Sequence, residues 1–153
     1  PVERLVMKFG IFIAAVALMA SAANAQMPRQ SAPENAQLYF VSPAHGEIVS
    51  SPVRVKFGLQ NMGVAPALAF QDAGSMTHFP NTGHHHIVID APLPPLDQPV
   101  PANENYVHFG TGATETTLNL APGEHTLQLI LGDALHIPHN PPVFSEQITI
   151  IVE

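Results

Sequence analysis

Three consecutive histidines open an apolar segment of the chain, residues 83–90 (GHHHIVID). Imidazole is the commonest metal ligand among protein side chains. The apolar residues that follow predict a buried β-strand, in which successive side chains point to opposite faces. His84 and His86 therefore share one face, where two neighbouring rings can chelate one ion, and His85 points to the other face.

Histidine is abundant and cysteine is absent: the chain contains nine histidines and no cysteine. Disulfides, thiolate catalysis, iron–sulfur clusters and thiolate-bound blue copper are therefore excluded. A second pair of histidines flanks Ile137-Pro138, a stiff dipeptide that sets the separation of the two rings. This pair, the two histidines of the strand and one further histidine make up the candidate metal ligands. They are His84, His86, His108, His136 and His139.

The elements that must position these side chains are strands. Apolar alternation and Gly/Pro turns predict about seven short strands, at 38–41, 53–59, 84–90, 106–109, 114–120, 125–131 and 146–152. No amphipathic helix is predicted, and the 16 prolines fit loops and strand edges. We therefore expect an all-β fold, an immunoglobulin-like antiparallel β-sandwich.

Strand topology sorts the histidines between the two ends of this sandwich, because successive connections alternate between ends. The 60–83 loop, the 110–113 turn and the 132–145 loop fall at one end, and all five candidate ligands lie there. His45 and His125 fall at the opposite end. His125 shares a face with core leucines, which indicates a structural role.

The direction in which each strand points its side chains further limits which histidines can share a metal ion. The isoleucines of 84–90 suit the core, so His84 and His86 are expected to face outward, and the apolar neighbours of His108 turn that ring outward too. If the two strands pair, these three imidazoles meet on one sheet surface. His85 is then the inner histidine, and we expect it to be hydrogen-bonded rather than bound to metal.

The donor set favours copper over zinc, since both suit imidazole and copper(II) binds more tightly. A cluster poor in carboxylates argues against calcium and magnesium. Met62, Met76, His78 and Asp133 are expected nearby, where the thioethers could serve copper(I). Binding or delivery of the ion is favoured over turnover. Two alternatives stay open: a metalloenzyme with an open coordination position, and a metal-free immunoglobulin-like interaction module.

The N-terminal residues predict export. A short positive region at Met7-Lys8 precedes the apolar stretch 9–20, and Ala23-Asn24-Ala25 is a small-x-small cleavage signal. We expect a signal peptide over 1–25, with 1–6 preceding the start methionine, although a retained anchor is the alternative. A flexible linker over 26–37 and the sandwich domain over 38–153 would follow. The mature protein is then periplasmic or secreted, without membrane insertion.

Cleavage would leave an acidic protein. Removing residues 1–25 takes Lys+Arg from 5 to 3 and Asp+Glu from 12 to 11, so the net charge changes from −7 to −8. Nucleic acids and anionic membrane surfaces are therefore not expected as partners. A metal cation is favoured, and a periplasmic partner protein stays open.

The segments GHHHIVID, YVHFG, HTLQLILGD and HIPH resemble those of an uncharacterised family of bacterial exported proteins, classed as a domain of unknown function. The resemblance covers residues 38–153 and implies a single periplasmic domain, but no activity. A weaker resemblance to copper–zinc superoxide dismutase consists of the His-x-His strand in a β-sandwich. The cysteines and the other strand motifs of that enzyme are missing, so its activity is not carried over.

Overall fold

The structure is a computed structural model that describes residues 28–67 and 79–153, so the expected signal peptide lies outside the described residues. The described residues form nine strands and no helix. The strands are β1 (Gln37–Ser42), β2 (Ile48–Val49), β3 (Val53–Gln60), β4 (Gly63–Val64), β5 (Thr82–Ile89), β6 (Tyr106–His108), β7 (Glu115–Leu118), β8 (Gly123–Gly132) and β9 (Ile148–Val152). The expected all-β sandwich is confirmed. Within this part of the chain no helix could cross a membrane.

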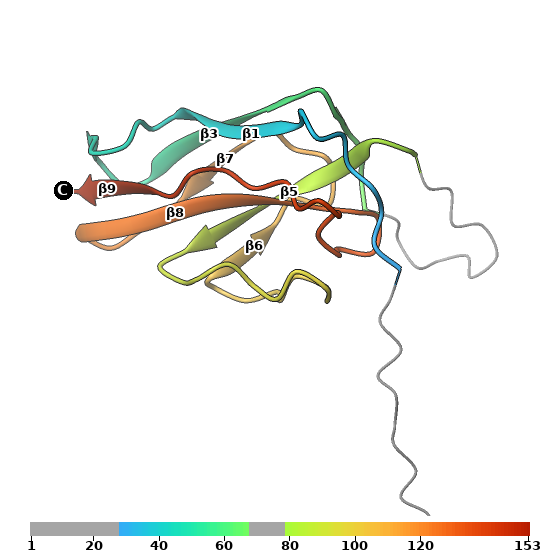
Figure 1. The fold of residues 1–153 in the computed structure, drawn as a ribbon. Coiled ribbons are helices and arrows are strands. Elements are labelled where there is room, and N and C mark those ends of the chain that lie inside the picture. Colours follow the sequence, from blue (N-terminus) through green and yellow to red (C-terminus); the bar gives the residue numbers. More distant parts are fainter. Residues whose placement is uncertain (1–27, 68–78) are drawn as a thin grey trace, which may run out of the picture.

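Two sheets form the layers of the sandwich (Figure 1). One has the order β1-β3-β7, and the other has the order β2-β9-β8-β5-β4, with β6 also paired to β5. Most strand pairs are antiparallel, as expected, and two are parallel: β2 runs parallel to β9, and β4 runs parallel to β5. Both exceptions are two-residue strands that loops add to the larger sheet, which explains why apolar alternation did not reveal them.

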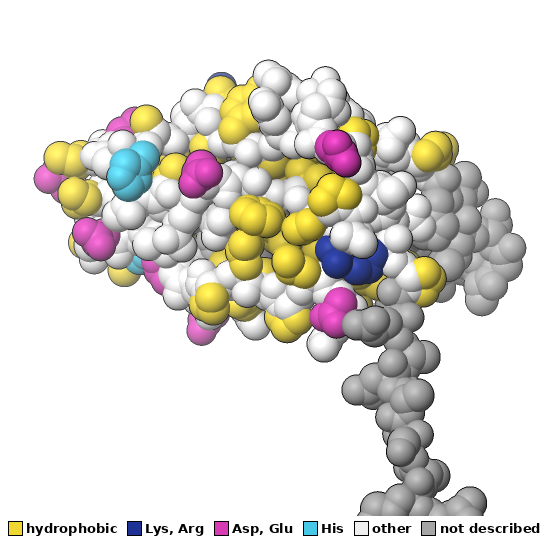
Figure 2. Space-filling model, in the orientation of Figure 1, with side chains coloured by type: hydrophobic (Ala, Val, Ile, Leu, Met, Phe, Trp, Pro, Cys, Tyr) yellow, Lys and Arg dark blue, Asp and Glu magenta, His cyan; other side chains and the backbone are white. Residues whose placement is uncertain are grey.

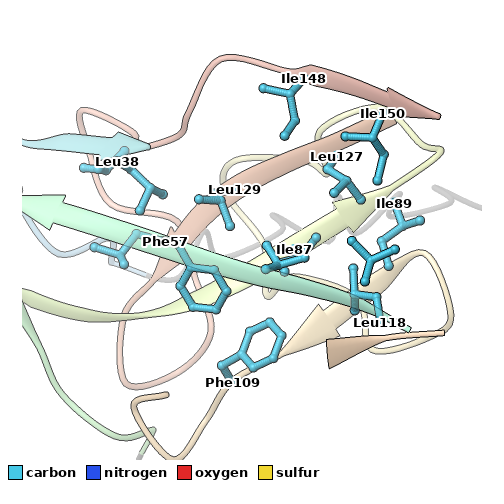
Figure 3. Close-up of a cluster of buried hydrophobic side chains, with 14 of the residues drawn as sticks. Leu38, Phe57, Ile87, Ile89, Phe109, Leu118, Leu127, Leu129, Ile148 and Ile150 are labelled. Carbon is cyan, nitrogen blue, oxygen red and sulfur yellow. The ribbon is translucent and has the colours of Figure 1, made fainter. Parts of the chain in front are cut away.

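The core lies between the two sheets (Figure 3). Alternate residues of β3, Val53, Val55 and Phe57, are buried while Arg54 and Lys56 are exposed. From the other sheet, β5, β8 and β9 contribute branched aliphatic side chains to the same cluster. Removal of this apolar area from water is the main source of the fold's stability.

On the outer face of the larger sheet, the part formed by β5 and the end of β8 is buried as well. Val88 of β5 and Ile130 of β8 form a second small cluster with Val100, which belongs to the Pro-rich connector after β5. The connector is fastened by a hydrogen bond from the Tyr106 hydroxyl to the Pro92 carbonyl, 2.8 Å long. Side chains on this face of β5 are therefore shielded from water.

Residues 28–36, within the expected linker, contact the loop that follows β8 (Figure 1). Arg29 donates from Nε to the Pro138 carbonyl at 2.9 Å, and the Asn140 amide donates to the Gln30 carbonyl at 2.8 Å. Ala32 packs into the core. These contacts fasten the loop that carries His136 and His139.

Candidate metal centre

Strand β5 and the loop after β8 bring three imidazoles together. The ring centroids of His84 and His86 are 4.5 Å apart, as expected for residues two apart on a strand. His136 meets this pair from the loop, with its Nδ1 hydrogen-bonded to Nε2 of His84 at 2.9 Å. One nitrogen from each of the three residues lies within 4.8 Å of the others. Small side-chain adjustments would bring such atoms to the donor separations that a metal ion requires.

His108 lies beside this triad. In the register of β5 and β6, His108 stands directly opposite His86, and the two ring centroids are 4.4 Å apart. The centroids of His108 and His136 are 4.8 Å apart. The Nε2–H group of His108 donates to the Pro101 carbonyl at 2.9 Å, because a carbonyl oxygen can only accept. In the neutral ring this leaves the Nδ1 lone pair available to a metal.

Gly132, at the end of β8, makes room for the triad. A Cβ at this position would lie 2.6 Å from Cε1 of His86 and 3.3 Å from Cα of His136. Only glycine lets strand β8 and the following loop approach the two rings so closely.

His84 and His86 point away from the main core, on the face of β5 opposite Ile87, yet both are 0% exposed. The connector and the loop after β8 cover this face. Neither segment has a periodic sequence pattern from which this burial could be predicted. Nδ1 of His84 and both ring nitrogens of His86 are buried without a hydrogen-bond partner. Such groups are rare in folded proteins, since each loses its bonds to water without replacement.

The electrostatics favour neutral rings. Burial lowers the pKa of His84 to about 3, and the neighbouring imidazoles of His136 and His108 add to this shift. Burial likewise lowers the pKa of His86 to about 2, and the backbone of Ile130 opposes this shift without meeting either ring nitrogen in hydrogen-bond geometry. The pKa of His136 is also lowered by burial, and then by His108, although Asp133 opposes the shift. A neutral imidazole is the form that binds metal.

The fifth candidate ligand, His139, lies apart from the four clustered rings. Its Nε2–H donates to the Thr82 carbonyl at 3.0 Å. Its Cε1 lies 2.8 Å from where a Cβ of Gly83 would be. Since Gly83 and His84 point to opposite faces of β5, His139 lies on the other side of the sheet from the triad. His139 does not belong to the group of three histidines that could hold a metal ion.

His85 faces the core, where its ring lies 4.6 Å from that of Phe57. The expected hydrogen bond is not formed, because neither ring nitrogen has a partner. Burial lowers the pKa of His85 to about 4. The backbone of Ala113 opposes this shift without meeting the ring in hydrogen-bond geometry.

His125 and His45 have separate structural contacts. His125 donates from Nδ1 to Asp90 at 2.7 Å and from Nε2 to the Ala121 carbonyl at 2.8 Å, which joins the end of β5 to the start of β8. Nδ1 of His45 accepts from the Thr149 amide at 3.0 Å. Neither belongs to the group of three histidines that could hold a metal ion.

Four other residues were expected near the metal ligands, and they lie in different parts of the chain. Met62 packs against the core cluster, and Asp133 is buried beside the loop that carries His136. Met76 and His78 lie outside the described residues. Pro101 and Gly132 were not identified from the sequence, because a backbone carbonyl and a missing Cβ leave no signal beyond a Pro or Gly in a turn.

Fold and site together define a β-sandwich protein with a buried histidine triad that could hold a metal ion. The chain belongs to the family described as domain of unknown function (DUF4399), whose model matches residues 55–153. The match confirms the resemblance to an uncharacterised family, over a shorter range than expected. No curated protein and no solved structure matches the chain.

Proposed function

We propose that this protein binds one transition-metal ion, copper in preference to zinc, outside the cytoplasm, and holds or delivers it. The ligands are His84, His86 and His136, with His108 as the fourth. His139 is left out of this set because its ring lies on the opposite face of β5.

The observation that carries the proposal is the environment of His86. Its ring is 0% exposed, lies against two other imidazoles, and has no hydrogen-bond partner at either nitrogen. Burying a polar ring in this way is unfavourable unless something satisfies its nitrogen. A metal ion between the rings would do so.

The chemistry of the donors supports copper or zinc. Neutral imidazoles suit both ions, and copper(II) is the stronger binder for a given nitrogen site. The acidic surface would favour the approach of a cation: on the face shown in Figure 2, acidic side chains are scattered and basic ones are few. The expected net charge of −8 after loss of residues 1–25 follows from Lys+Arg falling to 3 and Asp+Glu to 11.

Metal analysis of untagged protein provides the test, because a polyhistidine tag would itself bind the ion. We expect one equivalent of copper or zinc after purification or after titration of the demetallated protein. His84→Ala and His136→Ala should each abolish stoichiometric binding. Wild-type protein that binds neither ion would exclude the proposal.

Two controls separate the site from histidine content in general. His45→Ala and His125→Ala each remove one imidazole from outside the triad, so they should retain the full metal equivalent in the folded fraction. If His125→Ala abolished metal binding while His84→Ala retained it, the proposed set of ligands would be wrong.

A catalytic metal is the second candidate. Three histidines are a ligand set that catalytic zinc uses with water in the fourth position, and His108 differs from the triad because its Nε2 is occupied by Pro101. His108→Ala distinguishes a four-histidine storage or delivery site from a three-histidine catalytic site. An unchanged metal affinity in this variant, together with an exchangeable water on the metal in the wild type, would favour a catalytic metal.

A further inference from the structure

Asp133, the first residue after β8, is the one buried carboxylate among residues 28–67 and 79–153, with 2% of its surface exposed. It forms no ion pair with any described residue. Arg29, which lies in the same region, donates instead to the carbonyls of Pro138 and His139. A buried carboxylate without a counter-charge is unfavourable, and such groups in proteins are normally paired with a cation or coordinate a metal.

One oxygen of Asp133 organises the loop that carries His136. Oδ1 accepts from the amides of Leu135 at 2.8 Å and of Ile137 at 3.0 Å. The backbone closes the same turn, because the His136 amide donates to the Asp133 carbonyl and the Asp133 amide to the Ile137 carbonyl, both at 2.9 Å. His136 itself has a φ of 65°, a left-handed conformation that is unfavourable for residues with a Cβ. The Asp133 turn therefore holds His136 in an otherwise disfavoured backbone conformation.

The other oxygen, Oδ2, is buried and has no hydrogen-bond partner in the protein. Asp133 also lines a cavity of about 20 Å³, together with Thr82, Gly83 and Ala134. A cavity of this size admits about one water molecule, which could satisfy Oδ2 but would leave the negative charge uncompensated.

We propose that Asp133 is the positioning and charge-compensating residue of the metal centre: its Oδ1 holds the His136 turn, and its buried negative charge stabilises the bound cation without ligating it. This inference rests on the proposed function, because it requires an ion at the histidine triad. Asp133 would also supply the negative charge opposite the cation, which the neutral imidazoles do not provide.

Asp133→Asn tests the charge while keeping the turn, because the amide oxygen can still accept from Leu135 and Ile137. We expect the affinity for copper(II) and zinc(II) to fall roughly 10–100-fold, the range typical for partners beyond the metal ligands. The reduction potential of the copper-loaded protein should become more positive, because a nearby negative charge favours copper(II) over copper(I). Asp133→Ala removes both the charge and the turn, and it should lose more affinity than Asp133→Asn.

Glu124→Gln is the matched control, since it removes the same charge from an exposed position on β8. It should change neither affinity nor potential. If Asp133→Asn does not fold, Asp133→Ser provides a neutral variant whose hydroxyl can also accept from backbone amides.

The outcomes separate the two proposals. Metal binding by wild type with equal affinity and potential in Asp133→Asn would overturn the role of Asp133 and leave the histidine site intact. An equal loss in Glu124→Gln would also overturn it, because the effect would then reflect overall charge. Absence of copper and zinc binding in the wild type and in Glu124→Gln would overturn the proposed function itself.

Discussion

Nε2 of His84 and Nδ1 of His136 share a hydrogen bond of 2.9 Å, although the two residues come from β5 and from the loop after β8. A neutral imidazole carries one N–H and one lone pair, so one ring donates and the other accepts. An ion that binds both nitrogens replaces this bond. The ring that donates must shift its proton to its other ring nitrogen as the ion enters, and no net proton needs to leave.

Metal affinity should therefore persist in mild acid. The pKa values of His84 and His86 lie at about 3 and about 2, so protons do not compete with metal for these two rings at pH 5, and the lowered pKa of His136 weakens the competition at the third ring. We expect the metal-induced increase in Tm to be similar at pH 7.5 and pH 5. A saturating ion at a hundredfold excess over Kd stabilises by roughly 2.7 kcal/mol. A gain that disappears between pH 7 and pH 6 would contradict neutral rings.

The protein without added metal should respond to acid differently. His84, His85 and His86 have folded-state pKa values below the ordinary 6.5, so their contribution to stability is present above pH 6.5 and is lost as the pH falls toward about 4. The free energy of unfolding should decrease over this window, as followed by denaturant titration in the presence of chelator. A free energy that is constant from pH 7 to pH 4 would argue against the burial of these rings.

The ion pair of His125 and Asp90 should show the opposite dependence. Hydrogen bonding to Asp90, followed by that to Ala121, raises the pKa of His125. Its contribution is therefore fully present below pH 6.5 and is lost as the pH rises through the raised value. Asp90→Asn should destabilise the protein at pH 6, and its difference from wild type should narrow at pH 9. Metal affinity is the internal check, since it should be unchanged in this variant.

Gly132→Ala should damage fold and site together. The added Cβ would meet Cε1 of His86 at 2.6 Å, so strand or ring must move. Overpacking of this kind typically destabilises by about 1–3 kcal/mol, and displacement of His86 should lower metal affinity at least about tenfold, the lower end of the range for groups that orient ligands. Gly110→Ala is the control, because its Cβ would make only an ordinary contact, at 3.5 Å from Ala67. Equal behaviour of the two variants would contradict the close packing at Gly132.

His85→Leu should stabilise the protein without changing the metal site. The ring of His85 faces the core beside Phe57 and has no hydrogen-bond partner, so an apolar side chain avoids the burial of two unsatisfied nitrogens. We expect a gain of about 1 kcal/mol in the free energy of unfolding, with metal affinity unchanged. Loss of metal binding in this variant would place His85 in the site.

Much of this arrangement could be predicted from local pattern. Alternation identified β3, the apolar run after the histidines identified β5, and the spacing of His84 and His86 placed both rings on one face. The sequence left open whether the strand of His108 pairs with β5, and the structure places His108 opposite His86.

The burial of that face could not be predicted, because it depends on contacts between segments without periodicity. The Val100 amide, in the Pro-rich connector, donates to the His136 carbonyl at 2.8 Å. The place of His139 depends on the bridge between Gly132 and Pro138, which turns the chain between the two histidines. Neither contact follows from the spacing of histidines along the sequence.

Strand β5 presents two independent sets of side chains. Residues such as His85 and Ile87 belong to the apolar core, and His84 and His86 belong to the histidine triad. Changes in the first set alter stability, whereas changes in the second alter what the protein binds. In the course of evolution, relatives could therefore keep the same sandwich while exchanging the residues at positions 84 and 86, and so acquire a different ligand or lose binding altogether.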